Sequence, residues 1–406
     1  MGTVIIIGGG AAGMAAAIAA ASCGDSVTVL ERMDRVGKKI LATGNGRCNL
    51  MNTGEWRFPG GSEMAKVVLE HCGVQEQTRF WRHIGLRMRQ EDGGRVYPIS
   101  GMASTVLDAL RFAMDAMGVE IVTGVHVSGL FKARRGWTVM ACEQKWKADR
   151  VIVAGGGCAQ PKLGSDGSVW PLLTALGHRL VAPRPALTQI ITDTAPIKGL
   201  GGIRIRTALR LTRQGREVYR EAGELLFADY GVTGVCVMQC ARYAEAGDVL
   251  HIDLVKAMGF DMADDFKQEL HRRRKLWGNT RLQADLLTGL CVPKLAQALF
   301  AASGMSGVQR FACGQLTTAD IERLVAKVAD FPLTVKGVKG FDSAQVTAGG
   351  IAAADFNPDT LESRLAPGVH AAGEVLDVDG DCGGFNLMFA FGSGILAGLN
   401  GRACPW

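Results

Sequence analysis

The chain has 406 residues, of which 48% are hydrophobic and 21% charged, and this is enough apolar material for a large core divided over two or three domains. A formal net charge of +6 suits anionic cofactors and substrates but is too small to indicate a nucleic-acid partner. The 11 cysteines include no Cys-x-x-Cys pair and the seven histidines have no metal-ligand spacing, so we expect no metal site.

The first predicted element lies in an uncharged segment, VIIIGGGAAGMAAAIAAA, that runs from Val4 to Ala21. Its length is close to that of a bilayer span. Alanine and glycine favour membrane insertion only weakly, however, and no basic residue precedes the segment, so we expect neither an anchor nor a signal peptide. Reduced thiols and a cytoplasmic location are therefore expected. The segment instead predicts a strand, a glycine-rich turn and a helix.

A second short strand, Val27–Leu30, ends in Glu31 and completes a βαβ unit. In the G-x-G-x-x-G motif of this unit, Gly8 permits the tight turn, Gly10 lets a pyrophosphate approach the backbone, and Gly13 allows close packing of helix and strand. The helix N-terminus offers free N–H groups to the phosphates. Glu31 stands where an acid accepts a hydrogen bond from the adenosine ribose. Together these elements predict a dinucleotide site.

Three further helices are expected, at 62–72, at 75–84 and from an N-cap at Ser104 to about Gly118. They are followed by the strands of a meander at 119–131, 137–143 and 148–154. The last strand leads to Gly155 and Gly157, which could open a second dinucleotide motif. Gln160 stands where the third glycine would be, and Pro161 follows it. We therefore expect a strand end that closes over the first cofactor.

The middle of the chain changes period twice. From about 187 to 255 apolar and charged residues alternate, with a turn at Gln214-Gly215, which predicts an antiparallel hairpin. From 256 to 325 the period is helical, and Thr317 with Asp320 resembles a capping box. The apolar face of that helix comprises Ile321, Leu324, Val325 and Val328. We expect a discontinuous nucleotide-binding domain (1–190 and 345–406), a β-domain (191–255 and 326–344) and a helical domain (256–325).

The last part of the chain predicts a strand at 369–372, an acidic loop and a glycine-rich helix that begins near Phe385. A helix N-terminus reached through Gly383-Gly384 suits an anionic group such as the N1–C2=O edge of a reduced flavin. The alternating acids Asp377, Asp379 and Asp381 could instead form a calcium loop. Met388 holds the place of the bidentate glutamate that such a loop requires, which argues against calcium.

These motifs resemble a family of bacterial flavoproteins described as NAD(P)/FAD-dependent oxidoreductases, which includes bile-acid dehydro-reductases and an aminoacetone oxidase. The resemblance covers nearly the whole chain and is most specific in TGNGRCN (43–49) and GEVLDVDG (373–380). It implies an α/β fold in which a glutathione-reductase-like Rossmann domain binds FAD and is interrupted by an antiparallel β-domain and a small helical domain.

The resemblance also implies which residues bind FAD, while it assigns no catalytic residue and no metal ligand. The residues for the ADP half are Gly8, Gly10, Ala12, Gly13 and Glu31. Those near the pyrophosphate and the ring are Lys39, Thr43, Gly44, Asn45, Gly46 and Arg47. Those that close over the cofactor are Gly155, Gly156, Gly373, Glu374, Asp377, Gly384 and Phe385.

Three residues depart from the family pattern: Met51 replaces a usual Thr, Phe385 a usual Tyr and Met388 a usual Gln. The changes make the surroundings of the flavin more apolar and favour a hydrophobic substrate, although drift without meaning for the substrate explains them equally well. Other residues also keep two interpretations. Cys48 could be a redox thiol or a buried filler, of which the filler is the commoner. Tyr97 and Tyr230 could be proton donors or core aromatics.

The leading functional hypothesis is an FAD enzyme that takes hydride from NAD(P)H and reduces the activated C=C bond of a hydrophobic, steroid-like enone. One alternative is an FAD-dependent amine oxidase that uses oxygen. Another is a flavin-dependent RNA-modifying protein, suggested by the basic run at 271–275, which more often forms a solvated helix face. We expect a small-molecule substrate rather than a nucleic acid or membrane, and the oligomeric state is open.

Overall fold

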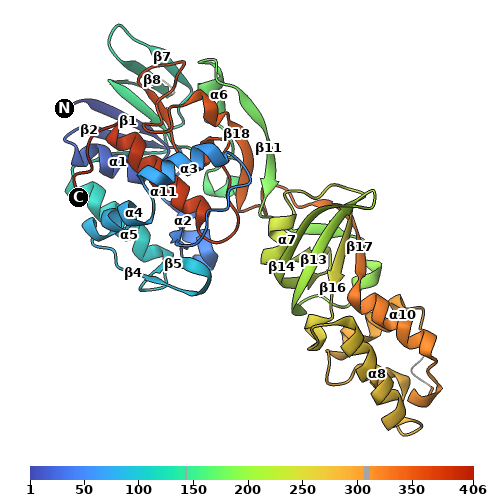
Figure 1. Cartoon of the computed structure of the whole chain (residues 1–406). Helices are drawn as coiled ribbons and strands as arrows, with labels where there is room; N and C mark the ends of the chain where they lie inside the picture. The colour runs from blue at the N-terminus through green and yellow to red at the C-terminus, as the bar shows by residue number, and fades with distance from the viewer. Residues whose placement is uncertain (142–143, 306–310) are drawn as a thin grey trace. The chain divides into compact units, whose positions relative to one another are not determined.

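The computed structural model describes residues 1–141, 144–305 and 311–406. These residues form two compact units (Figure 1). The first unit comprises Met1–Pro185 and Phe341–Trp406, and the second comprises Ala186–Gly340. Two expected features include residues that lie outside the described ranges, namely the strand at 137–143 at its end and the helical domain at 256–325 in its interior.

A five-stranded parallel sheet forms the centre of the first unit, with the order β19-β10-β1-β2-β6. Its strands are β1 (Thr3–Ile7), β2 (Ser26–Glu31), β6 (Glu120–Thr123), β10 (Arg150–Val153) and β19 (Val369–Ala371). Every residue of β10 and β19 is buried, as expected for strands covered on both faces. The sheet thus combines strands from both ends of the chain, and the expected α/β class is confirmed.

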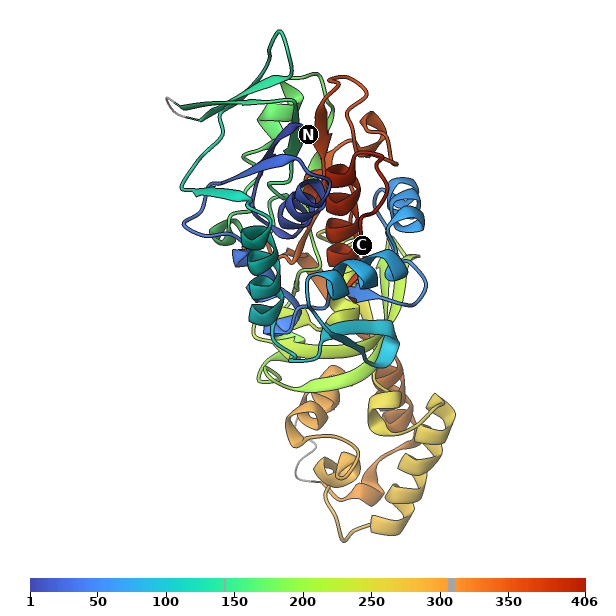
Figure 2. The same ribbon diagram turned by 90° about the vertical axis from the view of Figure 1, so that its left-hand side faces the viewer.

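Two small-residue helices, α1 (Ala11–Ser22) and α11 (Phe385–Leu399), pack against each other in the first unit (Figures 1 and 2). A Cβ added to Gly394 would lie 2.3 Å from the carbonyl oxygen of Ala12, and one added to Gly398 would lie 2.4 Å from that of Ala16. This close approach buries α1 on all sides, which explains why its sequence carries no charge. In the described residues no helix is both long and apolar enough to cross a bilayer.

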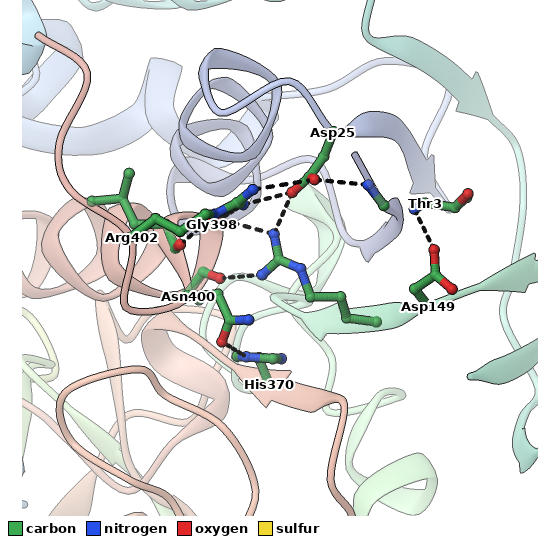
Figure 3. A network of polar contacts seen from close by, with 11 residues as sticks. Thr3, Asp25, Asp149, His370, Gly398, Asn400 and Arg402 are labelled. Atoms are coloured by element: carbon green, nitrogen blue, oxygen red, sulfur yellow. Dashed lines mark hydrogen bonds and ion pairs between the residues drawn. The ribbon is translucent and has the colours of Figure 1, made fainter. Parts of the chain in front are cut away.

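A polar network holds the C-terminal end of α11 (Figure 3). The Arg150 guanidinium donates to the carbonyl oxygens of Ala397 and Gly398, at 3.0 Å each, and to Asp25 at 2.7 Å. Arg402 also donates to Asp25, at 2.6 Å. Burial alone would raise the pKa of Asp25, but the hydrogen bonds from Arg402 and Arg150 outweigh it and lower the pKa. Cations at a helix C-terminus complement the helix dipole, so the network stabilises the end of α11.

Smaller elements surround the parallel sheet. The helices are α2 (Lys38–Ala42), α3 (Ser62–His71), α4 (Val74–His83), α5 (Ala103–Ala116) and α6 (Trp170–Thr174). One three-stranded sheet has the order β3-β5-β4 (Met51–Asn52, Arg95–Pro98 and Met88–Gln90), and another the order β7-β8-β9 (Gly129–Lys132, Trp137–Ala141 and Gln144–Ala148). A two-stranded sheet pairs β11 (Leu180–Ala186) with β18 (Val346–Ile351).

Several expected elements agree with this part of the structure and two do not. The helices expected at 62–72 and 75–84 are confirmed as α3 and α4. The expected N-cap at Ser104 is wrong, because Met102 is the N-cap and its N–H donates to Ser100 Oγ at 3.2 Å. The single strand expected at 119–131 is also wrong: β6 pairs with β2 in the parallel sheet, whereas β7 pairs with β8.

The second unit contains a closed barrel with the order β12-β15-β14-β13-β16-β17. Its strands are β12 (Ile190–Thr192), β13 (Arg204–Arg213), β14 (Arg216–Ala228), β15 (Gly231–Thr233), β16 (Val249–Asp253) and β17 (Phe331–Val338). Its helices are α7 (Val235–Cys240), α8 (Ala263–Trp277), α9 (Pro293–Ala302) and α10 (Thr318–Ala329). Barrel and helices share one hydrophobic core. The expected division into three domains stays a prediction.

Two local motifs of the second unit are confirmed. The hairpin β13–β14 turns at Gln214 (φ 50°) and Gly215 (φ 77°), the two positive φ values that a tight hairpin turn requires. Helix α10 begins with a capping box, in which Asp320 N donates to Thr317 Oγ1 at 3.1 Å and Thr317 N donates to the Asp320 carboxylate at 2.8 Å. The predicted apolar face of α10 is buried.

Candidate functional site

The glycines of the β1–α1 turn have different surroundings. Gly8 has φ 103°, and a Cβ there would lie 2.7 Å from the carbonyl oxygen of Ala154. A Cβ on Gly13 would lie 1.9 Å from the carbonyl oxygen of Gly8. Gly10, the N-cap of α1, differs because a Cβ there would meet no heavy atom within 4 Å. Gly8 and Gly13 therefore serve packing, whereas Gly10 leaves open space in front of the helix N-terminus, where an anion is stabilised.

The Glu31 carboxylate is fixed at the end of β2. One oxygen accepts a hydrogen bond from Gly9 N and the other from Met33 N, both at 2.7 Å. A carboxylate has about four acceptor positions. Glu31 can therefore hold the turn and still accept a hydrogen bond from a hydroxyl group of a ligand.

A cavity of about 40 Å³ adjoins Gly8 and Glu31. Its lining residues are Ile7, Gly8, Leu30, Glu31, Arg32, Val125, His126, Val127, Gly155, Gly164, Ser168 and Val169. The cavity brings the predicted Gly8, Glu31 and Gly155 together. Arg32 and Gly164 also line the cavity but were not predicted. The Arg32 guanidinium donates to Gly164 O at 3.2 Å and pairs with Asp166 at 2.8 Å. These two contacts fix the 160–168 loop beside the cavity.

Lys39 and Glu374, both predicted site residues, form an ion pair at 2.7 Å. Lys39 belongs to α2, whose N-cap Gly37 donates to Gly9 O at 2.8 Å, so α2 starts at the glycine turn. The second oxygen of Glu374 accepts from Thr347 N at 2.9 Å. The ion pair therefore joins the N-terminal and C-terminal parts of the site.

Thr347 was not predicted, although the segment QVTAGGI that contains it carried part of the family resemblance. Its hydroxyl oxygen accepts hydrogen bonds from Cys158 N at 2.8 Å and Ala159 N at 3.0 Å. A Cβ on Gly157 would lie 2.5 Å from the same oxygen. Thr347 thus fixes the segment after β10 that contains the predicted Gly155 and Gly156. A Cβ on Gly155 would lie 2.3 Å from Val169 Cγ1, and Gly156 has φ 79°.

The residues Thr43–Arg47 form a tight loop directly after α2. The loop turns through three successive positive φ values, at Gly44 (56°), Asn45 (55°) and Gly46 (82°). Arg47 pairs with Glu91 at 2.5 Å. Its guanidinium also lies 4.0 Å from the centre of the Tyr97 ring. The hydrogen bond from Arg47 lowers the pKa of Glu91. Among the described contacts, none joins this loop to Gly8–Gly13 directly.

The start of α11 meets the segment after that loop. Gly384 has φ 104°, and a Cβ there would lie 2.7 Å from Met51 O and 2.8 Å from Asn49 Oδ1. Asn52 Nδ2 donates to Gly383 O at 2.9 Å. Asn49 Oδ1 is buried and has no hydrogen-bond partner in the described part of the chain. A buried amide oxygen beside a helix N-terminus is available to a ligand, since such atoms are normally hydrogen-bonded.

The remaining predicted residues have mixed roles. Gly373 (φ 75°) and Ala12 pack together, because a Cβ on Gly373 would lie 2.8 Å from Ala12 Cβ. Phe385 is 4% exposed and its ring lies 5.9 Å from that of Phe58, so it belongs to the core. The half-buried Asp377 donates through its backbone N to Ile351 O at 2.8 Å, which links the acidic loop to β18.

Burial bears on the alternative interpretations of single residues. Burial raises the pKa of the Cys48 thiol to about 12, which favours the filler over a redox thiol. Tyr97 is buried, and burial raises the pKa of Tyr230, whose ring lies 3.8 Å from Lys339 Nζ. The ten cysteines that the structure describes are free, and in the described ranges no cluster of three or more His, Cys, Asp or Glu could hold a metal ion.

Comparison with known proteins gives consistent matches. A family model described as HI0933-like protein Rossmann domain matches residues 2–400. The chain is 39% identical to a 3-dehydro-bile acid delta(4,6)-reductase of Clostridium scindens, over 98% of each chain. It is 26% identical to a ribosomal RNA dihydrouridine synthase of Haemophilus influenzae, over 98% of this chain and 97% of the other. The 3-ketosteroid delta1-dehydrogenase structure of Sterolibacterium denitrificans matches at 14% identity and a TM-score of 0.49, over 98% of this chain and 99% of the other.

Proposed function

The chain belongs to the HI0933-like Rossmann-domain family and is an FAD-dependent oxidoreductase, and from this premise we propose that it reduces a C=C bond conjugated with a carbonyl group. The names of two relatives support this reaction. A 3-dehydro-bile acid delta(4,6)-reductase reduces double bonds near a ketone, and dihydrouridine is uridine hydrogenated at the double bond next to a carbonyl group. The two substrates differ greatly, but the bond that is reduced is of one chemical type.

The residues of the first unit fit an anionic dinucleotide such as FAD. Gly10 and the N-terminus of α1 would face the pyrophosphate, because a Cβ position at Gly10 is free of neighbours within 4 Å. Glu31 would accept from the ribose, and Asn49 Oδ1, which is buried without a partner, would receive a hydrogen bond at the start of α11. Bound FAD supplies hydride transfer, and the protein supplies position and electrostatics.

We propose a hydrophobic, steroid-like enone as the substrate and NAD(P)H as the hydride source, in the cytoplasm. The observation that carries this proposal is the 39% identity to the bile acid reductase over 98% of both chains. The replacement of usual polar residues by Phe385 and Met388 adds little support for a hydrophobic substrate. Phe385 is 4% exposed and Met388 is fully buried, so both side chains belong to the core.

Anaerobic mixing tests this proposal. NADH or NADPH should bleach the flavin absorbance, and a 3-keto-Δ4 steroid acid should then restore it and gain two hydrogens by mass. The matched control is the saturated 3-keto steroid acid, which should leave the flavin reduced. If neither nicotinamide bleaches the flavin and an amine does so, the reductase proposal fails in favour of an amine oxidase.

A reduction of uridine in RNA is the second candidate, and the 26% identity to a ribosomal RNA dihydrouridine synthase favours it. The basic run at 271–275 lends it little support. Arg272 and Arg273 pair with Glu269 at 2.7 Å, and Arg274 donates to Leu316 O at 3.0 Å, so these cations are engaged within the unit. Salt-dependent binding of ribosomal RNA, with a mass gain of two hydrogens on a uridine, would support this candidate.

A further inference from the structure

A second cavity in the first unit has a volume of about 410 Å³ and shares no lining residue with the cavity beside Gly8 and Glu31. One wall is α4, where Val74, Thr78 and Arg82 lie on successive turns of one helix face. The opposite wall is the β3-β5-β4 sheet. There Met51 and Gln90 are both paired with Val96, so these three side chains share one face of the sheet.

Half of the twelve residues that line this cavity are apolar and half are polar or charged. Its remaining lining residues are Thr53, Leu86, Arg87, Met88, Arg89 and Ile99. Met51, Leu86 and Val96 are buried at 1%, 3% and 6% exposure, so they form a fixed floor. The volume falls in the range of about 300–1,000 Å³ that is usual for small-molecule sites. The cavity can therefore take a small molecule that has both an apolar and a polar part.

Three arginines and no acidic residue line the same cavity. Arg89 is neutralised by Glu91, which accepts from its Nε and Nη2 at 3.1 Å each. Arg82 and Arg87, in contrast, are exposed, and their side chains make no hydrogen bond or ion pair with any residue in the described ranges. A position in the last turn of α4 explains a cation at Arg82, because it complements the helix dipole. It does not explain Arg87, which lies beyond the helix.

We propose that this cavity binds an amphiphilic carboxylate, a molecule with one hydrophobic body and one carboxylate group. The body would lie against Met51, Leu86 and Val96. The carboxylate would be held by Arg82 and Arg87, since guanidinium groups match carboxylates in charge and geometry. The cavity adjoins the start of α11 through Met51, but its occupation can be measured without turnover.

Calorimetric titration of the FAD-loaded full-length protein tests the proposal, with octanoate as the probe. Octanoate should bind with saturation at one molecule per chain and more weakly at high salt, because screening reduces exposed charge interactions. Two matched probes separate the parts of the ligand: 1-octanol has the body without the charge, and acetate has the charge without the body. Each should bind at least tenfold more weakly than octanoate.

Variants of α4 and its neighbour complete the test. The double variant Arg82→Gln/Arg87→Gln should weaken octanoate binding at least tenfold, and Thr78→Phe should abolish it by filling the space. Arg79→Gln is the control, because Arg79 lies on the same helix, is exposed and does not line the cavity. Equal binding of octanoate and 1-octanol, no saturable octanoate binding, or unchanged affinity in the double variant would each overturn the proposal.

Discussion

Replacing Gly10 by alanine tests the proposed dinucleotide site with little effect on the fold. A Cβ at this position would meet no heavy atom within 4 Å, and the backbone is extended, with φ −84° and ψ −166°. Alanine adopts this conformation without strain. Because alanine caps a helix less well than glycine, we expect the free energy of unfolding of the FAD-free protein to fall by about 1 kcal/mol.

The affinity for FAD should respond quite differently. In a G-x-G-x-x-G turn the second glycine is the position where the backbone approaches the pyrophosphate, so the added methyl group would occupy space that the ligand requires. An extra methyl group in a well-packed contact costs about 1–3 kcal/mol. Because 1.4 kcal/mol corresponds to about a factor of ten, the dissociation constant should rise between about 5-fold and about 150-fold.

Two measurements on the same preparation separate these effects. Urea denaturation of the FAD-free protein, followed by circular dichroism, gives the free energy of unfolding. Titration with FAD, followed by its fluorescence, gives the dissociation constant. A Gly10→Ala variant that binds FAD as tightly as the wild type would refute the assignment of Gly10 to the pyrophosphate. A variant that loses more than about 2 kcal/mol without FAD would show that Gly10 serves packing, as Gly8 and Gly13 do.

Three further predictions concern the first unit. Gly13→Ala should lower the free energy of unfolding by about 1–3 kcal/mol, because the new Cβ would lie 1.9 Å from Gly8 O; an unchanged urea midpoint would contradict this. A chain that ends at residue 190 lacks β19 and α11 and should retain no FAD after gel filtration, whereas stoichiometric FAD would refute the discontinuous domain. Burial lowers the pKa of His370 from 6.5 to about 4, which favours the neutral form in the folded state. The resulting stabilisation of about 3 kcal/mol is present above about pH 6.5 and lost as the pH falls to about 4. His370→Gln should flatten the pH dependence of urea stability in this window, and an unchanged slope would exclude His370 as its source.

Local patterns allowed the glycine turn to be predicted correctly because its geometry depends on neighbours in the sequence. The packing roles of Gly8 and Gly13 follow from one strand–turn–helix unit, and the capping box of Thr317 and Asp320 follows from four consecutive residues. The expected strand at 119–131 was wrong for the opposite reason. Whether it continues or divides depends on its partners β2 and β8, which belong to separate sheets.

The parts of the candidate site that were missed depend on contacts between distant segments. Thr347 acts through hydrogen bonds to Cys158 and Ala159, nearly 190 residues earlier in the chain. Arg32 acts through Asp166 and Gly164. No spacing in the sequence indicates such pairs. Asn49 is the last residue of the TGNGRCN motif, so the sequence indicated its segment but not its role. That its side-chain oxygen is buried without a hydrogen-bond partner in the described part of the chain is evident only in the folded chain.

The pairing of α1 with α11 has a consequence for how the protein is made in the cell. Close to 360 residues separate the two helices in the sequence. At a synthesis rate of about 5–20 residues per second, the N-terminal helix waits about 20–70 s for its partner. During that time the uncharged, alanine-rich surface of α1 on the nascent chain is not yet packed against α11. Completion of this unit must therefore wait until α11 has been synthesised, and a premature stop codon before residue 385 would leave the first helix without its partner.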